Sequence, residues 1–341
     1  MKILLGMSGG LDSAYSAQRL IEEGHSVEGA VLIMHDYTEL DGARMVADEL
    51  GIKLHEIDCR AEFERAVISD FIEQYRLGRT PNPCIVCNRE VKFRVLLDYA
   101  KKNGFDRIAT GHYAKTVYSE KLGKTVIMRS HDEKKDQSYM LWRLGDDIKD
   151  NLIFPLSQLT KDEIRALAAE RGLSVAEKKD SQEICFIPSD DHGAYIEERV
   201  GKCPEGDFVD DGGRTVGRHK GIIHYTVGQR KGLGVALGQR AFITDIDPES
   251  NRITLSLSPR LTDRFSISDI VFSGMNEMNV GEEIDLLVKV RYQAPLSPSR
   301  LRYLGDGRAE VTLSTPLKSV TAGQSAVFYS EDGLMLGGFI D

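Results

Sequence analysis

The residues with the clearest chemical potential form a short loop near the start of the chain. It runs from Gly6 to Ser13 and reads Gly-Met-Ser-Gly-Gly-Leu-Asp-Ser. Gly9 and Gly10 allow the backbone to approach an anion closely, and the N–H groups of the helix that follows favour phosphate. The loop lacks both the Gly-Lys-Ser/Thr of a Walker A motif and a G-x-G-x-x-G fingerprint. It therefore predicts a different kind of nucleotide-phosphate site.

Three cysteines form a second group with reactive potential. Cys84 and Cys87 follow Asn82 and Pro83, a pair that suits the cap and the first position of a helix. A helix N-terminus lowers the pKa of a thiol, so we expect these two cysteines to be thiolates near neutral pH. Cys185 is the third member and follows an Asp-Ser-Gln-Glu-Ile sequence. The two other cysteines are interpreted as small buried apolar residues, namely Cys59 and Cys203.

The elements that must position these residues are predicted by their apolar periodicity. Strand-like runs cover residues 2–5, 27–34, 54–57 and 107–110. Helical patterns cover residues 13–23, 41–50, 63–75, 90–102 and 161–171. Strands separated by helices of 10–15 residues predict a parallel sheet covered on both faces. After about Cys203 the chain changes to short β-rich runs at residues 240–246, 252–257, 283–290, 299–304, 309–313 and 325–329, which predict small β domains.

Length and composition limit the class of protein. The chain has 341 residues, which suggests two or three domains. A net charge of −9 does not by itself indicate a nucleic-acid-binding protein, although local basic faces remain compatible with it. Five cysteines are too few for a disulfide scaffold. No apolar run reaches the ~20 residues of a membrane helix and no signal peptide is recognisable, so we expect a cytoplasmic protein without a membrane partner.

The glycine-rich loop resembles the S-G-G-x-D-S motif of the PP-loop pyrophosphatases, which cleave ATP between its α and β phosphates. Over nearly its whole length the chain resembles one family in this superfamily, the tRNA-specific 2-thiouridylases of the MnmA type. The matching segments are residues 6–13, 80–93, 111–113, 135–139, 154–156, 178–187, 225–234, 324–329 and 336–338.

The resemblance implies a fold and a division into domains. The expected fold is an α/β, adenine nucleotide α-hydrolase-like domain with a parallel sheet, followed by two small β-rich domains, the last of them a β-barrel. We expect the PP-loop catalytic domain at residues 1–198. A central β-rich domain would follow at residues 199–262, and the barrel at residues 263–341.

The resemblance also implies a reaction. ATP, with Mg²⁺, would adenylylate O2 of uridine 34 in the anticodon loop of a tRNA, and sulfur would then enter at C2. Cys185 matches the cysteine that carries a persulfide, and Cys87 matches the nucleophile, so a disulfide between two of the cysteines would form during turnover. A sulfur-relay protein or a cysteine desulfurase would supply the sulfur.

Further site residues follow by motif position. The expected ATP contacts are Gly6, Met7, Ser8, Gly9, Gly10, Leu11, Asp12, Ser13, Leu32 and Gly111. The expected tRNA contacts are Asn82, Pro83, His112, Lys135, Asp136, Gln137, Arg291, Tyr292 and Gln324. Tyr113 and Tyr139 are alternatives, either as stacking partners for a base or as half-buried sheet residues.

The chain departs from the family pattern at two positions. Cys84 replaces the usual Asp of the Asp-x-x-Cys turn, and Glu183 replaces a Gly just before Cys185. One hypothesis is that Glu183 takes over the acid–base or positioning role of the missing Asp. A competing hypothesis is that Cys84, Cys87 and Cys185 are three ligands of a [4Fe–4S] cluster that leaves one iron open to bind sulfide.

Two other functional classes use fewer of these features. A PP-loop ligase that adds an amine explains the phosphate loop but gives no role to the cysteine pair. A non-catalytic RNA-binding or redox-sensing protein conflicts with the intact phosphate loop.

Overall fold

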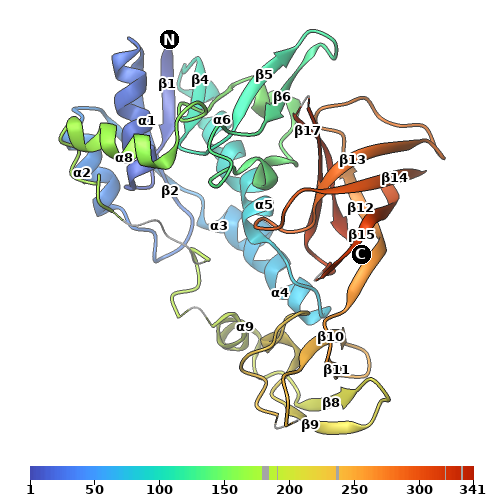
Figure 1. Ribbon diagram of the computed structural model, residues 1–341. Coiled ribbons are helices and arrows are strands. Elements are labelled where there is room, and N and C mark those ends of the chain that lie inside the picture. The colour runs from blue at the N-terminus through green and yellow to red at the C-terminus, as the bar shows by residue number, and fades with distance from the viewer. Residues whose placement is uncertain (179–183, 190, 236–237, 319, 332) are drawn as a thin grey trace.

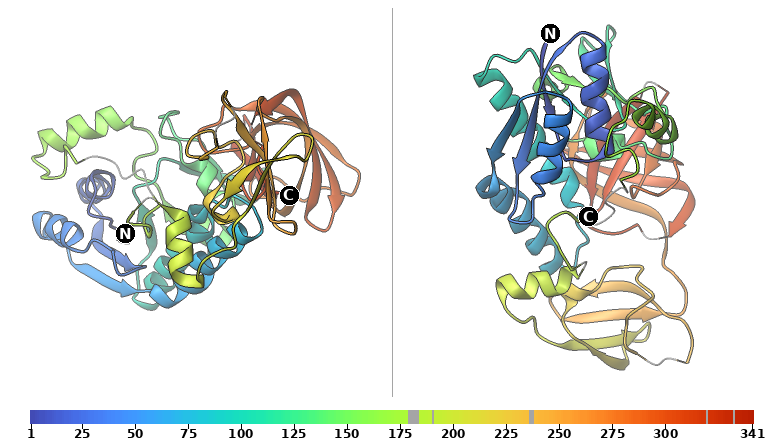
Figure 2. Two further views of the ribbon diagram at one scale, coloured as in Figure 1. Left: turned by 90° about the horizontal axis from the view of Figure 1, so that it is seen from below. Right: turned by 90° about the vertical axis from the view of Figure 1, so that its left-hand side faces the viewer.

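The computed structural model describes residues 1–178, 184–189, 191–235, 238–318, 320–331 and 333–341 (Figure 1). The first half of the chain forms an α/β part. A small β-rich part lies below it in this view, and a closed barrel at the C-terminus lies beside it (Figure 1). Figure 2 shows the same arrangement from two further sides, with the middle part projecting away from the parallel sheet. The predicted fold class is confirmed.

The core of the α/β part is a five-stranded sheet in the order β3-β2-β1-β4-β7, and every neighbouring pair is parallel. Its strands are β1 (Lys2–Gly6), β2 (Ser26–Ile33), β3 (Leu54–Asp58), β4 (Arg107–Thr110) and β7 (Leu152–Ile153). Gly6 pairs with Ala30 on one side and with Thr110 on the other. The strand order reverses at β1, so ligands are expected at its carboxyl end.

Helices cover both faces of this sheet because alternate strand residues point to opposite sides. Ile3 and Leu5 pack with α1 (Leu11–Glu22), α2 (Asp41–Glu49) and α8 (Lys161–Glu170). Leu4 points to the other face, in a core shared with α3 (Arg60–Phe63), α4 (Ser69–Arg76), α5 (Pro83–Cys87) and α6 (Phe93–Lys102). Shorter helical segments are η1 (Glu64–Ile68), η2 (Asn88–Lys92), η3 (Ser138–Leu141), α7 (Asp146–Lys149), α9 (His192–Val200) and η4 (Ile222–His224).

The cysteine pair opens a helical segment that continues from α5 through η2 to α6, so the helix predicted at residues 90–102 begins earlier, at Pro83. The side-chain oxygen of Asn82 accepts a hydrogen bond from the Cys84 N–H at 3.2 Å, and Pro83 takes the first helical position, as predicted. The η2 turn is a π-helix directly after Cys87.

The β-rich parts have distinct topologies. The middle sheet has the order β10-β11-β8-β9, from β8 (Gly206–Asp210), β9 (Thr215–His219), β10 (Phe242–Asp247) and β11 (Arg252–Ser256). The barrel closes in the order β12-β15-β14-β13-β16-β17. Its strands are β12 (Leu261–Val271), β13 (Glu283–Lys289), β14 (Ser297–Gly305), β15 (Arg308–Lys318), β16 (Ser325–Ser330) and β17 (Gly333–Ile340). A hairpin of β5 (Lys115–Ser119) and β6 (Lys124–Met128) extends from the α/β part.

The barrel docks on the segment around η3 through buried hydrogen bonds. The hydroxyl of Tyr139 donates to the carbonyl of Ser325 at 2.8 Å, and the indole N–H of Trp142 donates to the Ser325 hydroxyl at 3.1 Å. Both aromatic side chains are fully buried. Gly337 lies flat against Trp142, since a Cβ added there would sit 2.5 Å from the indole ring. Tyr139 is therefore a docking residue, and stacking on a base is excluded in this arrangement.

The barrel also holds the segment that leads to the cysteine pair. The N–H of Thr80 donates to the carbonyl of Ala322 at 2.9 Å, and the side-chain amide of Gln324 donates to the carbonyl of Thr80 at 2.7 Å. Gly323 packs so closely that an added Cβ would lie 2.9 Å from the Cβ of Arg79. The C-terminal barrel thus fixes the backbone four residues before Cys84.

Within the described ranges, no helix is long and apolar enough to cross a membrane.

Candidate functional site

The phosphate loop is shaped by a glycine that no other residue could replace without strain. Gly9 has φ +68°, and an added Cβ would lie 2.5 Å from the carbonyl carbon of Gly42. The loop therefore rests directly on the first turn of α2. Gly10 is the N-cap of α1, and no side chain caps that helix. Backbone N–H groups and the positive end of the α1 dipole are thus available to an anion, which fits the phosphates of a nucleotide.

Residues from two neighbouring strands reach the same edge of the sheet. Gly111 follows β4, and a Cβ added there would lie 2.8 Å from the backbone of Asp12. Leu32 is near the carboxyl end of β2, next to the strand that precedes the loop, and Met7 donates its N–H to Ala30 of β2 at 2.8 Å. The structure therefore brings together the loop, Gly111 and the end of β2, all of which were predicted to contact ATP.

An ion pair with a buried lysine anchors Asp12 at the start of α1. The Lys161 amino group lies 2.8 and 2.9 Å from the two carboxylate oxygens, and the side chain of Lys161 is only 8% exposed. The hydroxyl of Tyr113 donates to the same carboxylate at 2.7 Å. Tyr113 is buried, so it orients Asp12 and is not placed to stack on a base. Lys178 adds a further cation, donating to the carbonyl of Gly9 at 3.2 Å.

Lys161 is a residue of the site that the sequence reading did not single out. It is 149 residues from Asp12, and no local motif links the two. The sequence does contain a local signal for the helix that carries Lys161. Thr160 and Glu163 form a capping box that fixes the first turn of α8. This turn points its first lysine at the phosphate loop.

Cys87, which was predicted to be the nucleophile, lies at the same edge of the sheet. Cys87 is 6% exposed, and its Sγ lies 3.7 Å from the Sδ of Met34, the residue that follows β2. Cys84 and Cys185 are exposed. Each of these two thiols interacts electrostatically with Cys87 and with the other, so the three sulfur atoms share one neighbourhood. Of the other cysteines, Cys59 is buried as predicted, whereas Cys203 is only half-buried.

The prediction that these cysteines are thiolates near neutral pH is wrong for this arrangement. Burial raises the pKa of Cys87 to about 12 and that of Cys185 to about 11, and it also raises the pKa of Cys84. Cys84 and Cys185 keep some surface in contact with water, which limits this effect for them but does not reverse its direction. The physical reason is that burial outweighs the helix start, and Cys87 lies beyond the first turn of the helical segment that begins at Pro83.

One cation opposes this rise in thiol pKa. Lys92, five residues after Cys87, lowers the pKa of all three thiols, although less than burial raises it. Its charge also disfavours the protonated form of His112, whose pKa burial lowers well below its usual value. Burial and the charge of Lys92 therefore both favour a neutral His112.

The described residues do not form a metal site. Within the described ranges, no three His, Cys, Asp or Glu side chains stand close enough together to hold a metal ion. Glu183 lies outside the described residues.

The residues predicted to contact tRNA fall into three groups. In the first group, Asn82 and Pro83 directly precede Cys84, and His112 is close enough to Lys92 to interact with its charge. The His112 ring hydrogen-bonds with the Thr110 hydroxyl at 2.9 Å.

The second group forms a network at residues 130–138. The Asp136 carboxylate is buried and accepts a hydrogen bond from the Ser138 hydroxyl at 2.8 Å, so its side chain organises this loop from inside. Gln137 accepts a hydrogen bond from the N–H of Tyr113 at 2.9 Å, which connects the loop with the phosphate site, and Lys135 lies in the same loop.

The third group belongs to the barrel. Arg291 is partly buried, and its guanidinium donates to the carbonyl of Val227 at 3.3 Å and to the hydroxyl of Thr321. The ring of Tyr292 lies 6.2 Å from that of Tyr139. Gln324 holds Thr80, as described above.

Family models match nearly the whole chain. They are described as a tRNA methyl transferase HUP domain (residues 1–189), a tRNA methyl transferase PRC-barrel domain (residues 193–257) and an aminomethyltransferase beta-barrel domain (residues 262–340).

Curated relatives match over the full length. A tRNA-specific 2-thiouridylase MnmA 1 of Clostridium tetani is 42% identical, covering 100% of this chain and 96% of the relative. A tRNA-specific 2-thiouridylase MnmA of Carboxydothermus hydrogenoformans is 40% identical, covering 100% and 97%. Among solved structures, a 4-thiouridine synthetase in an RNA complex with bound ATP is 20% identical with a TM-score of 0.38, covering 54% of this chain and 44% of that chain.

The raised thiol pKa values predict slow, strongly pH-dependent alkylation. At pH 8 the thiolate fraction of Cys185 is on the order of 10⁻³ and that of Cys87 on the order of 10⁻⁴. Alkylation of each by iodoacetamide, followed by peptide mass spectrometry, should therefore rise about tenfold per pH unit from pH 7 to 10, while free glutathione levels off near pH 9.

Lys92→Met should slow both reactions further, because it removes the cation that favours the thiolates. Lys102→Met, at the far end of the same helical segment, serves as the control. A plateau of the wild-type rates below pH 9 would contradict the raised pKa values.

Proposed function

The chain belongs to the tRNA-specific 2-thiouridylase family, and we propose that its phosphate loop activates the tRNA uridine with ATP while its cysteines supply the sulfur. The protein is a tRNA-uridine 2-sulfurtransferase. The observation that best supports the division of labour is the position of Cys87. Its thiol contacts Met34, one residue beyond β2, at the sheet edge that also carries the phosphate loop. A base held between them would meet both groups.

The ATP side of the proposal rests on the loop and on its cations. Gly9, Gly10 and the uncapped start of α1 suit a polyphosphate, and Lys161 and Lys178 are placed to balance its charge. ATP supplies an adenylyl group, which converts O2 of the uridine from a poor leaving group into a good one. Mg²⁺ would accompany the phosphates.

The sulfur side rests on the contrast between an exposed and a buried thiol. Cys185 is exposed, so a sulfur-relay protein or a cysteine desulfurase can reach it and leave a persulfide there. In the next step the terminal sulfur bonds to C2 and AMP leaves. Cys87 gives up its proton and attacks the inner sulfur, a disulfide with Cys185 forms, and the C2–sulfur bond stays with the base. An external thiol then reduces the disulfide.

Holding Cys87 protonated until this step has a physical advantage. A buried thiol is a poor nucleophile, so it does not destroy the persulfide before the base arrives. Lys92 is the cation placed to stabilise the thiolate once the proton has left. Glu183 remains a hypothesis for the group that takes up this proton, and full thiolation activity in Glu183→Gln would overturn it.

A [4Fe–4S] mechanism is the alternative for the same thiolation. It requires three cysteine ligands at one cluster, and Cys84, Cys87 and Cys185 are the three thiols that interact with one another. Anaerobic purification followed by iron and acid-labile sulfide analysis tests it directly. About four irons per chain, lost in Cys84→Ser, would replace the persulfide route.

The roles proposed for Cys87 and Cys185 predict that loss of either thiol abolishes sulfur transfer but not activation of the uridine. Cys185→Ser and Cys87→Ser should each abolish 2-thiouridine formation while retaining ATP-dependent pyrophosphate release with unmodified tRNA, since activation of the uridine needs neither sulfur. The product is measured as a shifted band in a mercury-containing gel, with persulfide as the sulfur source. Cys203→Ser, in the middle part of the chain, is the matched control. Wild-type thiolation by either variant would contradict the proposal.

Lys161 is predicted to act before any sulfur transfer. Lys161→Met should reduce tRNA-dependent pyrophosphate release by roughly 10²-fold, because a desolvated cation beside the phosphates is lost. Lys2→Met, at the opposite end of β1, should leave it unchanged. The Tm of both variants shows whether the loss reflects unfolding. Normal pyrophosphate release by a folded Lys161→Met protein would exclude this role.

A further inference from the structure

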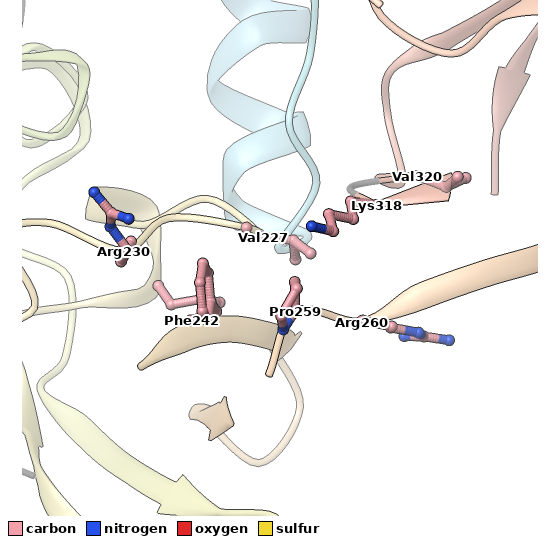
Figure 3. Close-up of a pocket in the computed structure, with 9 residues that line it drawn as sticks. Val227, Arg230, Phe242, Pro259, Arg260, Lys318 and Val320 are labelled. Atoms are coloured by element: carbon pink, nitrogen blue, oxygen red, sulfur yellow. The ribbon is translucent and has the colours of Figure 1, made fainter. Parts of the chain in front are cut away.

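A cavity of about 280 Å³ lies between the middle part of the chain and the barrel (Figure 3). Its walls come from β10, from the loop at Val227, from the linker before β12 and from the end of β15. Val227, Phe242 and Pro259 form an apolar centre (Figure 3). The amino group of Lys318 points toward Val227, whereas the Arg260 guanidinium extends away along the rim (Figure 3).

The charged residues around this cavity are all cations. Arg230, Arg260 and Lys318 line it, and no carboxylate does. These three residues are exposed, and none of the ion pairs found among the described residues involves any of them. A chain of net charge −9 offers many carboxylates that could have paired with them. Three unpaired cations around an apolar floor therefore mark a site for an anion that also carries a flat apolar surface.

The cationic surface continues beyond the cavity. A neighbouring hollow of about 420 Å³ shares Arg230 and adds Arg240, which is likewise exposed. The two hollows thus form a short track of four cations rather than an isolated pocket. Such a track suits a ligand with repeated negative charges, because successive phosphates of a polynucleotide can each meet a cation.

The walls of the cavity contact the segment that leads to the cysteines. Arg291 lies behind it and joins Val227 of its wall to Thr321, just past its rim. On the other side, Gly78 packs on Ile246 of β10, since an added Cβ would lie 3.0 Å from it. Ala322 and Gln324 hold Thr80. Both walls therefore end on the backbone that leads to Cys84.

We propose that this cavity is a second nucleotide subsite for the tRNA, distinct from the pocket for the target uridine. It takes a nucleotide whose ring packs on Phe242 and whose flanking phosphates meet Arg230, Arg260 and Lys318. The inference rests on the proposed tRNA substrate. Binding at this subsite, away from the reacting uridine, affects the cysteine segment through the Gly78–Thr80 backbone. Arg291 acts from behind by holding the wall and does not itself meet the RNA there.

The test measures the affinity of the full-length protein for unmodified tRNA over a range of salt concentrations. The triple variant Arg230→Ala, Arg260→Ala and Lys318→Ala should bind at least tenfold more weakly. The slope of log K against log[salt] should become shallower by about 2 to 3, or roughly 0.7–0.9 for each lost phosphate contact.

The control is a triple variant that removes the same amount of charge elsewhere, namely Lys53→Ala, Lys102→Ala and Lys121→Ala. Lys121 lies in the turn between β5 and β6, at the opposite end of the molecule (Figure 1).

A separate variant tests the ring. Phe242→Ala should weaken tRNA binding by roughly fivefold or more without changing the salt slope, because stacking is not an ionic interaction. Phe242→Leu keeps an apolar side chain at the start of β10 and should lose the same stacking, which separates this effect from misfolding.

Three outcomes decide the proposed subsite, and a fourth tests the proposed function. If the wild-type protein thiolates tRNA but the cationic triple variant matches its control in affinity and slope, the subsite is wrong while the proposed function stands. If tRNA binding is intact but sulfur transfer from a protein donor is lost, the cavity serves a protein partner and the subsite is also wrong. Weakened binding with a shallower slope supports it. A wild-type protein that neither binds nor thiolates tRNA would instead refute the proposed function.

Discussion

The close approach of backbone to backbone at the carboxyl edge of the sheet is the constraint on which the site depends. Gly9 rests on the start of α2, and Gly111 rests on the start of α1, in each case closer than any side-chain carbon would allow. These two contacts fix the phosphate loop between β2 and β4 without using its N–H groups. The loop can therefore direct those groups at an anion, and the ion pair between Asp12 and Lys161 fixes the first turn of the helix behind it.

Burial determines how the sulfur chemistry can proceed. A helix start favours a thiolate by a modest amount, whereas removing a thiol from water disfavours it by more, and the second effect is larger at Cys87. Negative charge on one of the three thiols also disfavours ionisation of the others. These cysteines therefore ionise one at a time, which suits a sequence of steps in which one sulfur acts as carrier and another as attacker.

Four of the five sheet strands, the longer covering helices and four of the six barrel strands could be predicted from the sequence, because each shows its own periodicity. The Asn82 cap was also predictable, since it is a local signal. The thiol pKa values were not, because burial of Cys87 depends on packing against Met34 and the distant core. Lys161 was missed for the same reason, as it meets Asp12 only in the folded chain.

Strand β17 was missed because Gly337 and Gly338 weaken its pattern, and Gly337 is required there by contact with Trp142.

The barrel contacts both the cavity proposed to bind RNA and the segment that carries the reactive cysteines. Its strand β16 is locked to Tyr139 and Trp142 by buried hydrogen bonds, and the loop before β16 holds Thr80. A shift of the barrel would therefore displace the backbone that positions Asn82 and Cys84, because Ala322 and Gln324 both hydrogen-bond with Thr80. The cavity beside Val227 lies at the joint between this barrel and the middle part of the chain. An RNA bound between the barrel and the middle part would act on the cysteine segment through the hydrogen bonds that already join the barrel to Thr80. Binding of the substrate would therefore be coupled to the position of Cys87.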